Sequence, residues 1–164
     1  MIIFINGSIN SGKTTIAKIL VKEFLKTAHI EVDALRRFIK WMPLEESIPI
    51  NLENTVSIIK NFIKRGINVV VTYPISQMNY DFLINNLKDL NEKIYVFTLN
   101  PKQDIVLTKR GTRALTNKEK ERVRYHYKIE INNPSFGEVI DNSNQSPEET
   151  VKIILDSIGL RPPE

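Results

Sequence analysis

The sequence contains no cysteine among its 164 residues, and it has only two histidines and one tryptophan. Without cysteine the chain can form no disulfide, no thiolate-ligated metal centre and no thiol nucleophile. The two histidines, His29 and His126, are too few to hold a structural zinc ion. Disulfide scaffolds, zinc modules and cysteine-dependent enzymes are therefore excluded.

Long apolar runs are lacking as well. No stretch approaches the roughly 20 apolar residues that a membrane-spanning helix needs. The apolar stretch at residues 1–5 is short and lacks the basic leader of a signal peptide. A content of 41% hydrophobic and 26% charged residues is typical of a folded globular chain, and this length suits one domain. We expect residues 1–164 to form a single cytoplasmic domain that does not bind a membrane.

Positive charge is concentrated in one segment. Residues 109–128 contain eight Lys or Arg and two Glu, although the net charge of the whole chain is only +4. A generally basic nucleic-acid-binding protein spreads its charge over a face of the molecule. The segment therefore requires a local explanation, and nucleic acid is not the expected partner.

Short apolar runs alternate with longer periodic ones, which predicts an α/β fold with a parallel sheet. Strands are expected at residues 2–6, 28–32, 68–72, 93–99 and 138–140. Apolar residues recur at helical spacing at positions 52, 56, 59 and 63, and again at 151, 154, 155 and 158. Asn100, Thr116 and Ser146 each have Gln or Glu three positions later, which predicts a capped helix start at each.

Residues 7–14 read Gly-Ser-Ile-Asn-Ser-Gly-Lys-Thr and match the phosphate-binding pattern G-x-x-x-x-G-K-[ST]. A predicted strand precedes this loop and a periodic helix follows it, as the pattern requires. Glycines let the backbone N–H groups point inward at phosphates, and the helix N-terminus adds partial positive charge. We expect a nucleotide to be bound by Gly7, Ser8, Asn10, Ser11, Gly12, Lys13, Thr14 and Thr15. In this arrangement Lys13 reaches the β- and γ-phosphates and Thr14 binds Mg²⁺.

With this loop, the chain resembles the small P-loop kinases, which include shikimate and gluconate kinases, adenylate kinase, chloramphenicol phosphotransferase and zeta-toxin-like kinases. The resemblance covers most of the chain and is strongest to the chloramphenicol phosphotransferase and zeta-toxin-like branch. It implies a three-layer α/β/α fold with a five-stranded parallel sheet and a mobile basic helical lid at about residues 110–128. It also implies ATP and Mg²⁺ as cofactors and transfer of the γ-phosphoryl group to a hydroxyl.

The acceptor side is expected just after the second strand, because ligands of open α/β sheets bind beyond the carboxyl ends of strands. Similar kinases carry D-x-x-R here, which Asp33 and Arg36 match. The resemblance implies that Asp33 takes the proton of the acceptor hydroxyl and that Arg36 binds the acceptor, helped by Arg37. Trp41 is expected to form a wall of the acceptor pocket. Alternatively, Asp33 serves as the N-cap of the following helix.

One expected group is missing after the third strand. Many P-loop kinases place an acidic residue there to hold the Mg²⁺ shell, whereas this chain has Val71-Thr72-Tyr73-Pro74. Either the hydroxyl of Thr72 or the carboxylate of Asp33 would then take the metal-side role.

The basic segment is expected to be the lid, because arginines on such a lid spread charge over the transferring phosphoryl group. By family position Arg110 serves the adenine and phosphates, and Arg110 and Arg113 stabilise the transition state. Arg122 and Arg124 are possible further donors, and His126 is assigned to packing. Residues 142–147 are expected to border the adenine, mostly through backbone contacts.

The predicted function is transfer of phosphoryl from ATP to a hydroxyl of a small molecule of the antibiotic, nucleoside or sugar-acid type. Two alternatives remain open. A polynucleotide 5′-kinase or nucleic-acid-end binder would use the basic segment to hold a strand. A regulatory module would bind nucleotide without transfer, as the missing acidic residue suggests.

Overall fold

The computed structural model of the chain describes residues 1–108, 110 and 114–160. Five parallel strands form one sheet in the order β2-β3-β1-β4-β5. The strands are β1 (Ile2–Gly7), β2 (Thr27–Glu31), β3 (Asn68–Thr72), β4 (Ile94–Leu99) and β5 (Glu138–Ile140). All five expected strands are present, with bounds that differ by at most one residue. The predicted parallel sheet is confirmed.

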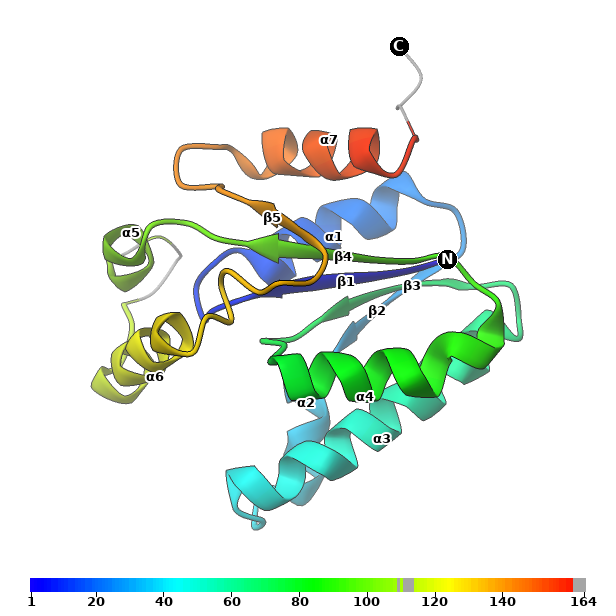
Figure 1. The fold of residues 1–164 in the computed structure, drawn as a ribbon, viewed down its shortest axis with the longest axis horizontal. Helices are drawn as coiled ribbons and strands as arrows, with labels where there is room; N and C mark the ends of the chain where they lie inside the picture. Colours follow the sequence, from blue (N-terminus) through cyan, green and yellow to red (C-terminus); the bar gives the residue numbers. More distant parts are fainter. Residues whose placement is uncertain (109, 111–113, 161–164) are drawn as a thin grey trace.

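Helices cover both faces of this sheet (Figure 1). The helices α1 (Lys13–Glu23) and α7 (Pro147–Ser157) lie on one face, and α3 (Leu44–Ile63) and α4 (Gln77–Leu87) lie on the other. The shorter elements are α2 (Val32–Leu35), η1 (Arg36–Ile39), η2 (Lys88–Leu90) and α5 (Gln103–Leu107). The helix α6 (Asn117–Lys128) lies with α5 beyond the carboxyl ends of the strands. The three-layer α/β/α architecture is therefore confirmed.

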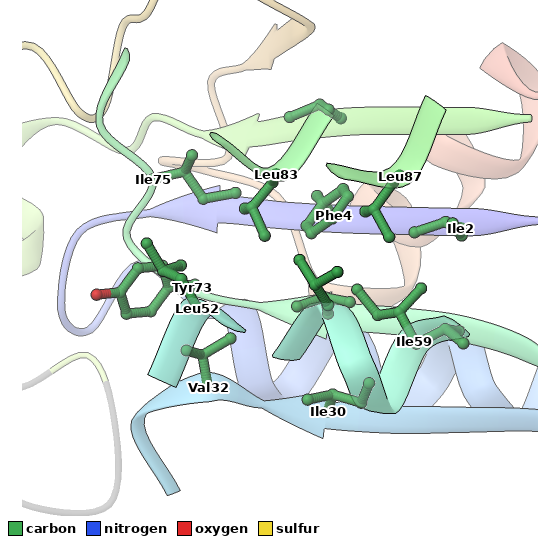
Figure 2. Close-up of a cluster of buried hydrophobic side chains, with 14 of the residues drawn as sticks. Ile2, Phe4, Ile30, Val32, Leu52, Ile59, Tyr73, Ile75, Leu83 and Leu87 are labelled. Atoms are coloured by element: carbon green, nitrogen blue, oxygen red, sulfur yellow. The ribbon is translucent and has the colours of Figure 1, made fainter. Parts of the chain in front are cut away.

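The core is divided into two apolar clusters, one on each face of the sheet. Side chains alternate along β1, so Ile2 and Phe4 join one cluster while Ile3 and Ile5 join the other. Figure 2 shows the first cluster, between β1, β3 and the helices α3 and α4. Each fully buried Ile, Leu or Phe side chain contributes roughly 1.5–3 kcal/mol. The two clusters make β1 a rigid base for the loop that follows it.

Two of the three predicted helix caps are confirmed. Thr116 caps α6 and Ser146 caps α7, each in a reciprocal capping box with a Glu. The prediction for Asn100 is wrong, because α5 begins at Gln103 and is preceded by Lys102 as its N-cap. The side-chain oxygen of Asn100 instead accepts a 2.7 Å hydrogen bond from Asn132. Its capping oxygen is therefore used by a distant residue.

No helix in the described part of the chain combines the length and apolarity needed to cross a lipid bilayer.

Candidate functional site

The loop between β1 and α1 depends on two glycines. Gly7 and Gly12 have φ angles of 141° and 105°, which side-chain-bearing residues rarely adopt. A Cβ on Gly7 would also lie 2.6 Å from Ser11 Oγ and 2.8 Å from the carbonyl oxygen of Leu99. No larger residue fits at Gly7 without movement of β4 or of the loop.

Asn6 fixes the start of this loop through four hydrogen bonds. Its Oδ1 accepts from the backbone N–H groups of Gly7 and Ile75, both at 2.7 Å. Its Nδ2 donates to Thr98 Oγ1 at 3.0 Å and to the carbonyl of Ile131 at 2.9 Å. The side chain is fully buried and its hydrogen-bonding capacity is used completely. No sequence motif predicted a role for Asn6, which ends the strand expected at residues 2–6.

Other segments hold the middle of the loop. Asn10, with φ at 63°, donates from Nδ2 to the carbonyl of Val106 at the end of α5 over 2.9 Å. Asn142, after β5, donates from its side chain to the carbonyl of Ser11 over 3.0 Å. The loop is thus hydrogen-bonded to α5 and to the segment after β5 before any ligand is bound.

Lys13 is the cation of the loop. Its Nζ donates a 2.7 Å hydrogen bond to the carbonyl of Ser8. Burial lowers the pKa of Lys13 to about 8, and the negative charges of Asp33 and Glu31 oppose that change. At neutral pH the ammonium therefore remains mostly protonated and available to a phosphate.

Two adjoining hollows open at the loop. The smaller, of about 210 Å³, is lined by Asn10, Gly12, Lys13, Thr14 and Thr15. In the described part of the chain, the backbone N–H groups of Gly12, Lys13 and Thr14 donate no hydrogen bond. Unpaired N–H groups at a helix N-terminus, beside an ammonium group and a hydroxyl, fit phosphates and their Mg²⁺ ion.

The larger hollow, of about 420 Å³, extends from the loop toward α5 and α7. It shares Asn10, Gly12 and Thr15 with the smaller one, and its further lining residues are Ile16, Ile105, Arg110, Asn142, Ser143, Gln145, Pro147 and Thr150. This mixture of apolar and amide side chains suits a nucleoside attached to the phosphates. The residues expected to border adenine therefore do line a cavity next to the loop.

Arg110 belongs to this larger hollow. It donates from Nη2 to the carbonyl of Asn142 over 2.7 Å, while its Nη1 is buried without a partner. Burial lowers the pKa of Arg110, and Tyr127 and Asp141 oppose that change. An unpaired guanidinium nitrogen here fits a phosphate or ribose oxygen. Arg113, the other expected lid arginine, lies outside the described residues.

Asp33 lies in α2, next to the end of β2. The N-cap of α2 is Glu31 and no side chain caps the helix, so the alternative capping role for Asp33 is wrong. Desolvation by surrounding protein raises the pKa of the Asp33 carboxyl, while the charge of Lys13 lowers it. Glu31 raises this pKa further, whereas the charges of Arg122 and Arg36 lower it. Asp33 thus faces cations from three elements.

The other expected acceptor residues differ in exposure: Arg36 is half-buried, whereas Arg37 and Trp41 are exposed. Arg36 has a buried Nε without a partner, and its charge acts on Asp33. Arg37 is exposed, and Trp41 is 80% exposed. The structure therefore places Arg36 with Asp33, whereas a pocket wall formed by Trp41 stays a prediction.

At the end of β3, where many P-loop kinases have an acidic residue, this chain has Thr72 and Tyr73. The hydroxyl of Thr72 is buried and pairs with His29 Nε2 at 3.0 Å, on the neighbouring strand. The ring of Tyr73 is buried, and its hydroxyl points away from the apolar cluster (Figure 2). Burial raises the pKa of Tyr73 to about 12, and the charges of Asp33 and Arg122 also act on it. Tyr73 is thus a neutral hydrogen-bond donor within electrostatic range of Asp33, and no sequence motif predicted a role for it.

The described residues contain no cluster of three or more His, Asp or Glu side chains that would hold a metal ion by itself. A Mg²⁺ ion would therefore depend on phosphate oxygens together with Thr14 and Asp33. This donor set fits Mg²⁺, which usually binds one or two protein oxygens plus phosphates.

The helix α6 presents one of its two candidate arginines to the site. Arg122 is partly buried, and its charge acts on Asp33, Tyr73 and His126. Arg124 is exposed, because residues two apart on a helix lie on different faces. Of the two possible further donors, Arg122 is the one that the structure brings to Asp33.

Comparisons with known proteins place this architecture. No family model matches the sequence, and no curated protein matches it significantly. Among solved structures, a sugar kinase from Janibacter superposes with a TM-score of 0.74 at 19% identity, over 98% of this chain and 95% of the other.

Two further structures agree. The gluconokinase of Sinorhizobium meliloti gives a TM-score of 0.71 at 16% identity, covering 96% of this chain and 90% of its own. The tunicamycin resistance protein of Deinococcus radiodurans gives 0.66 at 22% identity, covering 99% and 98%. The chain therefore has the fold of the small P-loop kinases, as the motif indicated.

Proposed function

We propose that the protein is an ATP-dependent phosphotransferase that moves the γ-phosphoryl group to a hydroxyl of a small molecule. One observation carries the proposal. The charges of Lys13 and Arg122 both act on the carboxyl of Asp33, beside a loop in which the N–H groups of Gly12, Lys13 and Thr14 donate no hydrogen bond among the described residues. Phosphoryl transfer requires such an arrangement, because its catalysis is mostly positioning and charge stabilisation.

The residues divide the work by position. The loop N–H groups and Lys13 would bind the β- and γ-phosphates, and Arg110 would bind the nucleotide in the larger hollow. Mg²⁺, when bound, would neutralise phosphate charge, with Thr14 and Asp33 as its protein ligands. Arg122 would stabilise charge on the transferring group.

Asp33 would receive the proton of the acceptor hydroxyl as the new O–P bond forms and the bond to the β-phosphate oxygen breaks. Burial raises the pKa of Asp33, which makes its carboxylate a better base. Tyr73 would donate a hydrogen bond to the acceptor, and Arg36 would donate hydrogen bonds to its oxygen atoms. A sugar acid, a nucleoside or an antibiotic with several hydroxyls meets these requirements.

The test is transfer of label from γ-labelled ATP with Mg²⁺ to pooled acceptors, using the wild type, Asp33→Asn and Asp156→Asn. The pools contain antibiotics, nucleosides, sugar acids and short oligonucleotides. We expect a labelled small molecule whose formation falls about 10²–10⁴-fold in Asp33→Asn. Asp156, exposed on α7, is the matched control and should not matter. Nucleotide binding without labelled product in any pool would favour the regulatory module, and full activity in Asp33→Asn would refute this base.

A specific observation favours a polynucleotide acceptor as the second candidate. Phe38 and Trp41 are 84% and 80% exposed and alternate with Arg37 and Lys40 just after Asp33. Exposed aromatic rings between cations are typical of surfaces that stack single-stranded bases. Under this candidate the oligonucleotide pool is labelled, and acceptor affinity falls steeply with salt. An acceptor affinity independent of salt would exclude it.

A further inference from the structure

The helix α6 makes a polar contact with the phosphate loop that the proposed chemistry does not use. The Nδ1 atom of His126 lies 3.1 Å from Ser8 Oγ, and the two residues are 118 positions apart. His126 is 2% exposed and Ser8 is fully buried. A hydrogen bond between two buried side chains from distant elements fixes their relative position.

Ser8 also accepts the hydrogen bond of Lys13. The carbonyl of Ser8 accepts the hydrogen bond from Lys13 Nζ, while its hydroxyl pairs with His126. The imidazole therefore holds the same residue that positions the ammonium of Lys13. Any displacement of Ser8 would move the acceptor atom of that hydrogen bond.

A second tether runs from the same turn of α6 to the other side of Gly7. The carbonyl of His126 accepts from the N–H of Ile131 at 3.0 Å, and the carbonyl of Ile131 accepts from Asn6 Nδ2. Residues 126–131 thus hold both neighbours of Gly7. Val123, one turn earlier, is fully buried, so the C-terminal half of α6 is packed against the protein.

The positive charges near His126 favour a neutral imidazole ring. His126 faces two cations, Arg122 on its own helix and Lys13 from the loop. Burial lowers the pKa of His126 to about 4, and both cations lower it further. The ring is therefore neutral at physiological pH and holds Ser8 without adding a third positive charge. A lysine or arginine at this position would repel Lys13.

We propose that His126 is a positioning residue: its ring fixes Ser8, and thereby couples the shape of the phosphate loop to the place of Arg122 on α6. This inference rests on the proposed nucleotide site. His126 contacts no reacting atom in this account, and it acts only through Ser8 and the loop.

The test measures binding of ADP with Mg²⁺ by calorimetry, without any acceptor. We expect His126→Ala and Ser8→Ala each to weaken ADP binding about 10-fold, the cost of one buried hydrogen bond. The double variant should be no weaker than either single one, because both lose the same bond. His126→Asn, whose amide can replace Nδ1, should regain most of the affinity.

The matched control is His29→Asn, which alters the other imidazole–hydroxyl pair, with Thr72 on the neighbouring strand. It should leave ADP affinity unchanged. If the single-variant effects add fully, or if the folded His126 and Ser8 variants bind ADP like the wild type, the inference is overturned.

A spectroscopic readout on the wild type needs only one folded variant, for assignment of the resonances. The chain has two histidines, so its imidazole ¹⁵N spectrum contains two ring systems, and His126→Asn or His29→Asn assigns them. We expect ADP to shift the His126 resonances and to leave those of His29 in place. Unchanged His126 resonances on ADP saturation would contradict the coupling.

The outcomes separate this inference from the proposed function. If the wild type binds no ADP, both fail together. If ADP binds and only the coupling is absent, the positioning role alone fails. If the coupling is found but no acceptor is phosphorylated, His126 keeps its role in a nucleotide-binding module.

Discussion

The phosphate loop and the acceptor segment, residues 33–41, differ in how firmly the fold holds them. Ser8 and Ser11 of the loop are fully buried, and the side chains of Asn6, His126 and Asn142 each form a hydrogen bond with the loop. In the described part of the chain, no side chain from 33 to 41 forms a hydrogen bond or ion pair, and the aromatic residues there are exposed. Under the proposed function, the nucleotide end is thus formed before any ligand binds, whereas the acceptor end is not.

This difference follows from what each end must recognise. A phosphate chain is the same in every nucleotide, so a rigid cradle costs no versatility and lowers the entropy lost on binding. An acceptor pocket formed by exposed side chains can close around one particular molecule. The proposed nucleotide site is therefore more completely formed than the proposed acceptor site.

The largest expected effect is the loss of ADP binding when the phosphate loop is distorted at Gly7. Gly7→Ala should abolish measurable ADP binding, at least a 10²-fold loss, because its Cβ would collide with Ser11 Oγ and the carbonyl of Leu99. Gly66→Ala is the matched control, since its φ is also positive, at 69°, but nothing lies within 4 Å of the added Cβ. It should cost only about 1 kcal/mol of stability and leave binding intact. Calorimetric titration with ADP compares the two variants. Equal ADP affinity in both would contradict the claim that the conformation at Gly7 shapes the loop for phosphate binding.

The next effect concerns the face of α6 that joins the two ends. Arg122→Ala should lower phosphoryl transfer about 10²–10³-fold, because a donor to developing charge is lost. Arg124→Ala, on the exposed face, should change transfer by less than about threefold. Steady-state rates with the acceptor that the labelling experiment identifies would measure both. A larger loss of activity in Arg124→Ala than in Arg122→Ala would show that Arg124, and not Arg122, serves the site.

A pH effect sharpens the role of Lys13. The folded chain releases this proton at a pKa of about 8 and the unfolded chain at 10.5. Between these values the unfolded state binds more protons, so Lys13 makes the fold more stable as pH rises. ADP binding should change in the opposite direction, weakening up to about 10-fold from roughly pH 7 to pH 9.5 as the ammonium charge is lost. Calorimetry across this range should show the decline in wild type and a flat profile in Lys13→Met.

Acid should act through His126 instead. Its folded pKa of about 4 lies below the ordinary value of 6.5, so the unfolded state binds more protons between them. The contribution of His126 to stability is therefore lost as pH falls, by roughly 3 kcal/mol near pH 4. Urea unfolding at several pH values should show this loss in the wild type and a smaller one in His126→Asn. Equal acid sensitivity of the two proteins would refute a buried neutral ring.

The smallest expected effect lies in the acceptor segment. Trp41→Ala and Phe38→Ala should change the free energy of unfolding by no more than about 0.5 kcal/mol, because both rings are already exposed. Denaturant unfolding measures this directly. A loss above about 2 kcal/mol would show that these rings pack against the fold and would remove the contrast between the two ends.

Local patterns predicted much of this molecule. The motif at residues 7–14 predicted the strand, loop and helix, and the boxes at Thr116 and Ser146 predicted two helix starts, because each depends on neighbouring residues alone. The prediction at Asn100 failed because Asn132, far along the chain, occupies its side-chain oxygen. The apolar spacing indicated a helix over residues 52–63, yet α3 already begins at Leu44 and includes Pro49.

Other residues of the candidate site could not be predicted from the sequence, again because their partners lie far along the chain. Asn6, Tyr73 and His126 belong to no motif, and their partners lie up to 125 positions away. Asp33 was found through its likeness to a family pattern, whereas the choice between Arg122 and Arg124 required the orientation of α6. Contacts between distant elements depend on the assembled fold and leave no local pattern.

The most direct test of the contrast is ¹⁵N relaxation of the ligand-free protein. The account predicts backbone order parameters of about 0.85 for residues 7–13 and a value below about 0.6 for the indole N–H of Trp41, the single tryptophan. Addition of ADP should leave the Trp41 value unchanged. A phosphate loop as mobile as Trp41, or a rigid Trp41 indole before any acceptor is present, would contradict the claim that only the nucleotide end is built in advance.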